Sequence, residues 1–283
     1  MGQSLVYIVM KVFESRIATK ADYRAVRRLC IRAVGEDDYV IPRLRNVISH
    51  GGLFLAFSGK ELVGMSNFSV TLDRAGWFGM VRTDPLWRRQ GVAIFLQKVK
   101  TRHARKLGIR KLRMFILSAN GPSLGASKKG GFRRVGESAH MTKQFQMKGV
   151  RAKYLFGSND SLMRSTYVAK MNGYFAYDGT FVKMDSKVVE ELERRREVYS
   201  TRGSTFILNS VDEFEVGRHR EFALLGGSFE AGLKDIVRTA SSLGSSSVGT
   251  FIPYENYLIS KARKFGFVSD DWGWHCILFE KRI

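Results

Sequence analysis

A short turn between a strand pattern and a helix pattern constrains this chain more than any other feature. The apolar run Trp77–Val81 predicts a strand. Apolar residues then recur at helical spacing, at positions 92, 96, 99 and 107. The chain must therefore pass from a strand into a helix within Asp84–Ala93, whose sequence is DPLWRRQGVA.

This turn has the composition of an anion-binding site. The first backbone N–H groups of a helix lack intrahelical partners and carry partial positive charge. Gly91 and the small Ala93 allow an anion to approach the backbone closely, and two arginines add charge. We therefore expect a pyrophosphate to bind here. The residues expected to hold it are Arg88, Arg89, Gln90, Gly91, Val92 and Ala93.

Two motifs in the first half resemble the GNAT superfamily of acyl-CoA N-acyltransferases. Arg88-x-x-Gly91-x-Ala93 has the (Gln/Arg)-x-x-Gly-x-(Gly/Ala) form of the acetyl-CoA loop of that family. The segment Asn120–Phe132, which ends in KGGF, is similar in length and ending to the family's Asn-x-x-Ala-x-x-Leu-Tyr-x-Lys-x-Gly-Phe. The resemblance extends from about Phe13 to Phe145. It implies an α/β fold with a mixed sheet flanked by helices, and acetyl-CoA as cofactor.

The resemblance also implies where the acyl end of the cofactor lies. Two parallel strands, expected at Trp77–Thr83 and Lys111–Leu117, would splay apart at their C-terminal ends. Main-chain groups there would contact pantetheine, and a backbone N–H would meet the oxyanion. The oxyanion donor so implied is Met80 or Val81, and the main-chain contacts to pantetheine are Met80, Val81 and Thr83. Asn120 also belongs to the expected cofactor set.

The proton-transfer groups depart from the family pattern. Ser127 stands where the family often has the tyrosine that protonates the leaving thiolate, so another residue donates or the thiolate leaves unaided. The base is open, because neither of the two parallel strands carries a carboxylate. Each candidate base is also readable as a plain surface or capping residue, and a water chain is the alternative. The candidates are Glu14, Asp37, Asp73, Glu137, His140 and the C-terminal carboxylate of Ile283.

Each of the other groups of charged residues in the first half has two possible roles. The loop residues Asp37, Asp38 and Tyr39 follow the first helix and either line the acceptor site or form a solvated cap. The helix 91–107 is expected to expose its charges, either as a solvated face or as a nucleic-acid contact. These charges are Lys98, Lys100, Arg102, Arg105 and Lys106. His103 falls on the apolar stripe and is expected to be a packed core histidine.

The second half echoes the first in the order of its predicted elements. A strand near Phe222–Leu225 precedes a helix, a strand, a second helix and KFGF at 264–267, which parallels KGGF at 129–132. We expect two domains, residues 1–149 with the acetyl-CoA site and residues 150–283 as a degenerate GNAT-like copy. The turn Leu224–Gly232 of this copy has no arginine and is not expected to bind a cofactor.

Composition limits the class of protein. No run of eighteen apolar residues and no leader-like N-terminus occurs, so we expect a cytoplasmic protein without a membrane span. Two distant cysteines, Cys30 and Cys276, argue against a disulfide scaffold or a metal site, and both are expected to be buried. Residues 1–150 hold 28 basic and 9 acidic residues, whereas residues 151–283 hold 19 and 17. The basic half indicates either an anionic partner such as nucleic acid or a basic proteome.

Two functions follow from these observations. The first is an N-acetyltransferase that moves an acetyl group from acetyl-CoA to an amine on a small molecule or a protein. The second is a catalytically weak binding module, either an acyl-CoA sensor or a nucleic-acid-associated protein. A nucleotide dehydrogenase is excluded, because the turn lacks Gly-x-Gly-x-x-Gly and a following acidic residue. Two fused copies also leave both a monomer and a homodimer open.

Overall fold

The computed structural model describes residues 13–146, 165–210, 219–269 and 275–283. Its contacts divide the chain into two compact units. The first holds the residues up to 69 together with 78–106, and the second holds 70–77 and the residues from 107 onward. The domain boundary expected at residue 149 falls outside the described residues and stays a prediction. Helices alternate with parallel and antiparallel strands, which confirms the α/β fold class.

The first unit is built on antiparallel strands. They are β1 (Glu14–Ile17), β2 (Leu53–Ser58), β3 (Glu61–Val70) and β4 (Gly76–Thr83), which starts in the second unit. β1 pairs antiparallel with β2, and β2 pairs antiparallel with β3. Gly59 makes the tight β2–β3 turn with a φ of 57°, a value that favours glycine.

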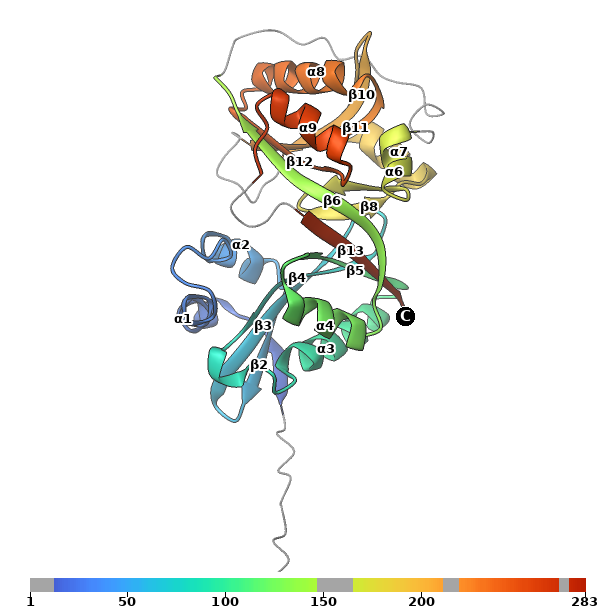
Figure 1. Ribbon diagram of the computed structural model, residues 1–283. Helices are drawn as coiled ribbons and strands as arrows, with labels where there is room; N and C mark the ends of the chain where they lie inside the picture. The colour runs from blue at the N-terminus through green and yellow to red at the C-terminus, as the bar shows by residue number, and fades with distance from the viewer. Residues whose placement is uncertain (1–12, 147–164, 211–218, 270–274) are drawn as a thin grey trace, which may run out of the picture. The chain divides into compact units, whose positions relative to one another are not determined.

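Helices cover both faces of these strands. α1 (Tyr23–Ala33) and α2 (Leu44–Ser49) lie on one side, and α3 (Val92–Lys106) lies on the other (Figure 1). Two 3₁₀ turns, Lys20–Asp22 and Ile41–Arg43, precede α1 and α2. Side chains alternate along β2, because Leu53 and Leu55 pack in the core with α1 and α2 while Phe54 contacts His103 of α3 at a ring distance of 5.1 Å. The expectation of a packed His103 is thus confirmed.

One expectation about α3 is wrong. Lys100 is only 1% exposed, whereas the other four charged positions expected on the outer face are exposed. Its Nζ donates hydrogen bonds to Ser66 Oγ and to the Asn67 carbonyl. Lys100 follows Leu96 by four residues and Val92 by eight, so it belongs to the buried stripe of the helix despite its charge.

The second unit holds a larger mixed sheet. Its strands are β5 (Lys111–Leu117), β6 (Arg133–Gln144), β9 (Val198–Ser200), β10 (Ser204–Ser210), β11 (His219–Gly227), β12 (Ser247–Pro253) and β13 (His275–Arg282). They lie in the order β5-β13-β6-β12-β11-β10-β9. The start of β4 pairs parallel with β5 through Gly76 with Leu112 and Trp77 with Arg113. This pairing confirms the expected parallel neighbours.

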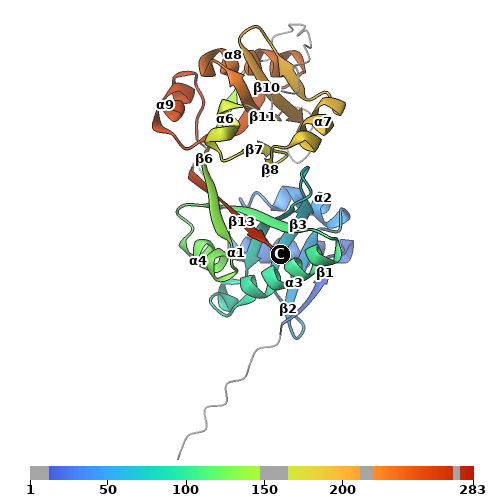
Figure 2. The ribbon, with the colours of Figure 1, turned by 90° about the vertical axis from the view of Figure 1, so that its right-hand side faces the viewer.

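Two faces of this sheet form separate cores. On β10, Phe206 and Leu208 pack with α8 (Phe229–Ser242) and α9 (Asn256–Lys264), while Ile207 packs on the opposite face. That opposite face is covered by α7 (Ser186–Arg194) and by the hairpin β7 (Tyr174–Tyr177) to β8 (Thr180–Lys183). Figure 2 shows α9 and α7 on opposite sides of β10 and β11. Among the described residues, the remaining α-helices are α4 (Gly121–Lys129) and α6 (Thr166–Lys170).

The final strands of the two halves are exchanged. β13, from the end of the chain, lies between β5 and β6 and pairs antiparallel with both. β6 extends past β13 and pairs antiparallel with β12. The order β5-α4-β6 in the first half matches β12-α9-β13 in the second, so each half places its last strand beside the other half's preceding strand.

The glycine turns before these two strands are the same in detail. Gly131 and Gly266 both have a φ of 77°. The N–H of Phe132 donates to the Ser127 carbonyl and that of Phe267 to the Ala262 carbonyl, each at 3.1 Å. The predicted echo between the halves is therefore confirmed as a repeat of structure.

Candidate functional site

The turn before α3 contains two residues of positive φ. Arg89 and Gly91 have positive φ values of 63° and 90°, and the first helical bond runs from the Phe95 N–H to the Gly91 carbonyl. A Cβ added to Gly91 would meet nothing within 4 Å, so the space over the helix start is open. Gly64 on β3 lets Val92 approach closely, since a Cβ there would lie 2.5 Å from Val92 Cγ1.

The two arginines of this turn differ in their surroundings. Arg88 donates from Nη2 to the carbonyl of Ala33, the last residue of α1, at 2.7 Å. Arg89 is exposed, and no contact of its guanidinium is found among the described residues. Gln90 folds back on the turn, because its Nε2 donates to the Leu86 carbonyl. The turn thus uses Arg88 to hold α1 and leaves Arg89 available to an anion.

Two ion pairs brace β4 and the turn against α1 and the loop after it. Asp38, 2% exposed, binds Arg82 of β4 through both of its oxygens at 2.5 and 2.7 Å. Arg32 of α1 donates from Nε at 2.7 Å to buried Asp84, which also accepts from the Leu86 N–H. Of the loop residues considered for substrate contact, Asp38 therefore has a structural role, whereas Asp37 is exposed.

β4 is irregular at the residue assigned to the oxyanion. Met80 has a φ of 51°, which is rare for a residue with a side chain and unusual inside a strand. Such a residue turns its peptide groups away from the regular ladder. Strain of this kind is concentrated at functional sites, where the surrounding structure maintains it. Met80, Val81, Thr83 and the turn 88–93 all lie in the first unit.

Asn120 and Ser127 lie in the second unit, on α4. Asn120 is the N-cap of this helix and accepts from the Ser123 N–H at 3.1 Å. Ser127 is fully buried, and its hydroxyl donates to the Leu124 carbonyl at 2.8 Å. It occupies the same place in its half as buried Ala262 does in the other. Both assignments to the site stay predictions, as does the splay of β4 from β5 beyond Trp77.

The candidate bases have different environments. Glu14 and Asp37 are exposed, and His140 lies against the Phe251 ring at 4.5 Å. The backbone N–H of Ile283 bonds to the Arg110 carbonyl. Asp73 forms an ion pair with buried Arg113.

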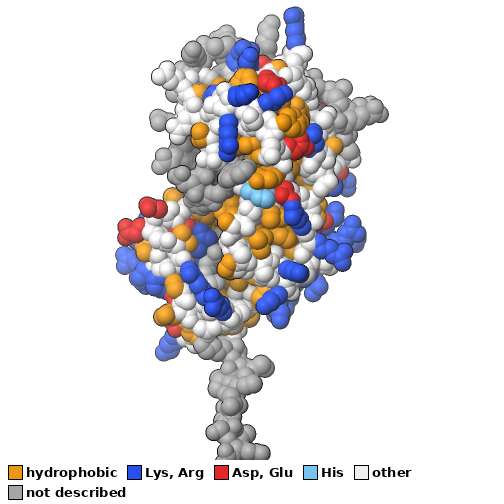
Figure 3. Space-filling view, viewed as in Figure 1, with side chains coloured by type: hydrophobic (Ala, Val, Ile, Leu, Met, Phe, Trp, Pro, Cys, Tyr) orange, Lys and Arg blue, Asp and Glu red, His pale blue; other side chains and the backbone are white. Residues whose placement is uncertain are grey.

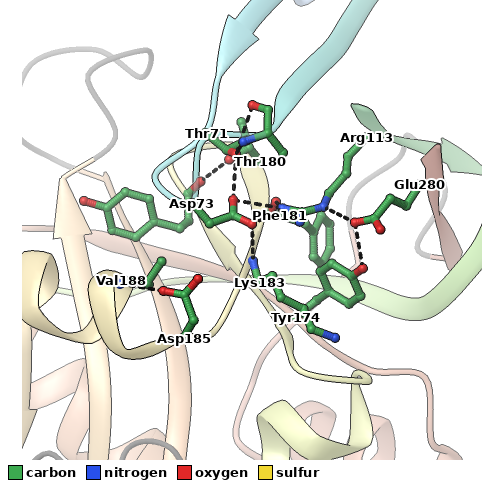
Figure 4. Close-up of polar contacts among 12 residues, drawn as sticks. Thr71, Asp73, Arg113, Tyr174, Thr180, Phe181, Lys183, Asp185, Val188 and Glu280 are labelled. Carbon is green, nitrogen blue, oxygen red and sulfur yellow. Dashed lines mark hydrogen bonds and ion pairs between the residues drawn. The ribbon is translucent and has the colours of Figure 1, made fainter. Parts of the chain in front are cut away.

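Figure 4 shows the cluster that holds Asp73. Arg113 on β5 is fully buried and binds Asp73 through Nη1 at 2.6 Å and Glu280 of β13 through Nε at 2.8 Å. Tyr174 donates to Glu280 at 2.9 Å, and the Lys183 N–H donates to Asp73. This network joins β5, β13 and the β7–β8 hairpin inside the second unit, which indicates a structural role.

Glu137 has a partner that the sequence did not suggest. His275, the first residue of β13, lies 2.7 Å from Glu137 through its Nε2, and its ring stacks on Tyr254 at 3.8 Å. The neighbouring Cys276 pairs with Leu117, so the imidazole lies at the carboxyl end of β5. Partial burial and the charge of Arg134 lower the pKa of His275. A neutral imidazole oriented by a carboxylate can accept a proton.

The equivalent turn of the second half is closed. Ser228 caps α8 with its own side chain, which accepts from the Ala231 N–H. A Cβ on the preceding Gly227 would lie 2.0 Å from the Gly203 carbonyl oxygen, because Gly227 pairs with Ser204. The expectation that only the first half binds a cofactor stays a prediction.

Basic side chains do not form one continuous patch on the face in Figure 3. Lys and Arg are spread over separate places there, with hydrophobic groups between them. Cys30 and Cys276 are buried, as expected. Within the described residues, no helix is both long and apolar enough to span a bilayer.

Comparisons with known proteins relate this chain to acetyltransferases. Residues 20–132 match the model of the acetyltransferase (GNAT) family. A proposed acetyltransferase from Thermoplasma acidophilum is similar in structure, with a TM-score of 0.62 and 16% identity over 96% of this chain and 100% of that one. A GCN5-related N-acetyltransferase from Sphaerobacter thermophilus has a TM-score of 0.59 and 14% identity over 95% of both chains. A search of curated proteins gave no match.

These similarities extend beyond the matched segment. Because the two solved structures cover nearly the whole chain, the second half shares the GNAT fold even though the family model ends at residue 132. Identities of this size establish the fold alone. Over residues 20–132, the chain is similar in sequence to the acetyltransferase (GNAT) family.

Proposed function

We propose that this protein is an N-acetyltransferase that transfers the acetyl group of acetyl-CoA to an amine. The observation that carries the proposal is the open start of α3 at Gly91, next to exposed Arg89 and preceded by the irregular Met80. A pyrophosphate would be held by the N–H groups at the start of α3 and by Arg89. Acetyl-CoA, when bound, supplies an activated thioester carbonyl.

The residues of the chain would act on the two ends of this transfer. The N–H of Met80 or Val81 would donate to the carbonyl oxygen as negative charge develops there. The amine nitrogen forms a bond to the acetyl carbon and the carbon–sulfur bond breaks. The amine loses one proton and the thiolate gains one, so the products are an acetamide and free thiol.

Within the second unit, His275 has surroundings that suit a proton acceptor, because its Nε2 lies 2.7 Å from a Glu137 oxygen. A lowered pKa keeps the imidazole neutral near pH 7, which is the form that accepts a proton. Ser127 is a poor candidate for proton donation to the thiolate, because its hydroxyl is buried and already donates to the Leu124 carbonyl. The acceptor is an amine on a small molecule or a protein.

Calorimetry with acetyl-CoA tests the binding part of the proposal. Gly91→Val should weaken binding at least about tenfold, because its φ of 90° is strained for valine and the side chain enters the open space. Gly59→Val is the matched control, since Gly59 also has a positive φ and free space but lies in the β2–β3 turn. Wild-type protein that does not bind acetyl-CoA would refute the proposal.

Thiol release against a panel of amines and peptides tests the chemistry. Binding without thiol release would instead favour the acyl-CoA sensor. A nucleic-acid partner is a separate proposal that the basic first half supports, and a gel shift at physiological salt checks it.

A further inference from the structure

A buried lysine of the first unit is connected to the irregular residue of β4 through one serine. Lys100 on α3 donates from Nζ to Ser66 Oγ on β3 and, at 3.2 Å, to the Asn67 carbonyl. Ser66 is fully buried, and its Oγ donates to the Gly79 carbonyl on β4 at 3.1 Å. The three groups form a chain of hydrogen bonds from an amine to a single main-chain carbonyl.

That carbonyl belongs to the same peptide group as the Met80 N–H. The described residues contain no cis peptide bond, so the carbonyl and the N–H of this group point in opposite directions. The Met80 N–H therefore points away from Ser66. A hydrogen bond accepted by the carbonyl polarises the peptide group, which makes its N–H a stronger donor.

A lysine at position 100 destabilises the folded protein more than an apolar side chain of similar volume would. It is 1% exposed, its Nζ lies 3.9 Å from the centre of the Phe78 ring, and burial lowers its pKa well below the ordinary lysine value. Burial of an amine disfavours folding unless hydrogen bonds compensate, and an apolar residue of similar volume often serves stability better. The helix nevertheless directs this amine to a hydroxyl that contacts β4.

We propose that Lys100 and Ser66 are positioning residues for acetyl transfer, which orient the Gly79–Met80 peptide and strengthen the Met80 N–H as the donor to the developing oxyanion. The inference rests on the proposed function, because it requires an acyl oxygen at this N–H. Neither side chain needs to touch the substrate. Both act through the main chain of β4, so their removal should affect the rate of transfer more than the binding of acetyl-CoA.

Steady-state kinetics with acetyl-CoA and an amine acceptor test this role. Ser66→Ala and Lys100→Met should each lower kcat by roughly tenfold while KM for acetyl-CoA stays within about twofold. The double variant should be no slower than the slower single variant, because both changes interrupt one chain. Ser66→Thr keeps a hydroxyl and should retain activity. Lys98→Met removes an exposed lysine of the same helix and should behave as the wild type.

Nuclear magnetic resonance supplies a measurement that does not depend on turnover. In protein labelled with ¹⁵N-methionine, the Met80 resonance is identified by its loss in Met80→Leu. Its amide proton should move upfield in Ser66→Ala and in Lys100→Met, but not in Ser66→Thr or Lys98→Met.

The two measurements separate the two proposals. An unmoved Met80 resonance in Ser66→Ala overturns the positioning role, even if the wild type transfers acetyl groups. Equal losses in kcat and in acetyl-CoA affinity for both variants would also overturn it, because they indicate a merely structural contact. A wild-type protein that releases no thiol refutes the acetyltransferase itself, whatever the resonance does.

Discussion

Different residues of the turn before α3 hold the turn in place and attract the anion. Arg88 closes the end of α1 through the Ala33 carbonyl, and Asp84 is tied to Arg32. These contacts fix the turn before any ligand is present, so that little ordering cost remains when an anion binds. Arg89 keeps its charge exposed at the open side of Gly91. Arg88 and Asp84 therefore preorganise the turn, and Arg89 supplies the charge that attracts the anion.

Replacing His275 tests the proton acceptor at this scale. Gln at this position can still donate to Glu137 but cannot take up a proton, so His275→Gln should lower kcat by about a hundredfold. The acidic limb of the pH profile should disappear. In the wild type that limb should lie below pH 6.5, because partial burial and Arg134 lower the pKa of His275. Glu137, Arg134 and Tyr254 are among the described polar groups around it.

His140→Gln is the control for this prediction, since His140 packs on Phe251. An unchanged acidic limb in His275→Gln would contradict the assignment.

The site residues that the sequence predicted depend on local backbone structure, whereas those that it missed depend on contacts between distant parts of the chain. Gly91 was predictable, because a glycine at a strand-to-helix turn is a local requirement of the backbone. The spacing of Lys100 from Leu96 indicated the buried face of α3, but its charge led to the prediction that it lies on the exposed face. His275 had none, because its place beside Glu137 depends on β13 pairing with β6, more than 130 positions away in the chain.

Elements with strong local patterns were predicted closely. The bounds expected for β5 are those observed, and the helix expected after the strand near Phe222–Leu225 is α8. The short β9 and β10 were not predicted, although β10 holds buried Phe206 and Leu208. The exchange of β6 and β13 also could not be read from sequence, because two equally apolar strands do not reveal which neighbour each will choose.

The contact of β13 with the β7–β8 hairpin predicts a loss of stability in alkali. Burial and the hydrogen bond to Glu280 raise the pKa of Tyr174 to about 12, above its ordinary value of 10. Between these values the folded chain binds more protons than the unfolded chain, so the free energy of unfolding falls as pH rises. The loss attributable to Tyr174 should be about 2 kcal/mol between about pH 9.5 and about pH 11.5.

Urea unfolding at the two pH values measures this loss. Tyr174→Phe is the control, because it keeps the ring but cannot ionise, and its stability should fall less than that of the wild type. Equal losses in the two proteins would contradict the prediction.

At the scale of the whole molecule, the exchanged strands should hold the two halves together after the chain is cut. β13 makes seven residue pairs with β5, from Cys276–Leu117 to Arg282–Lys111. β12 makes seven with β6. A protease site placed between residues 149 and 150 should therefore give two fragments that co-elute in size-exclusion chromatography. Residues 1–149 expressed alone should be insoluble, because β5 and β6 would present open edges.

An uncut chain carried through the same protease treatment is the control for this experiment. Fragments that elute separately, each with a folded circular-dichroism spectrum, would show that the halves are independent.

The strand exchange also affects how the sequence of each half can change during evolution. A strand swapped between two separate molecules depends on their concentration, but here the connection within one chain supplies an effective concentration near the millimolar range. A second half that lost its own anion site would therefore still be needed as a partner. Its loops are free to diverge, whereas β13 must still match β5 and β6. The last strand of the second half thus keeps a structural role between β5 and β6, whatever ligand that half binds.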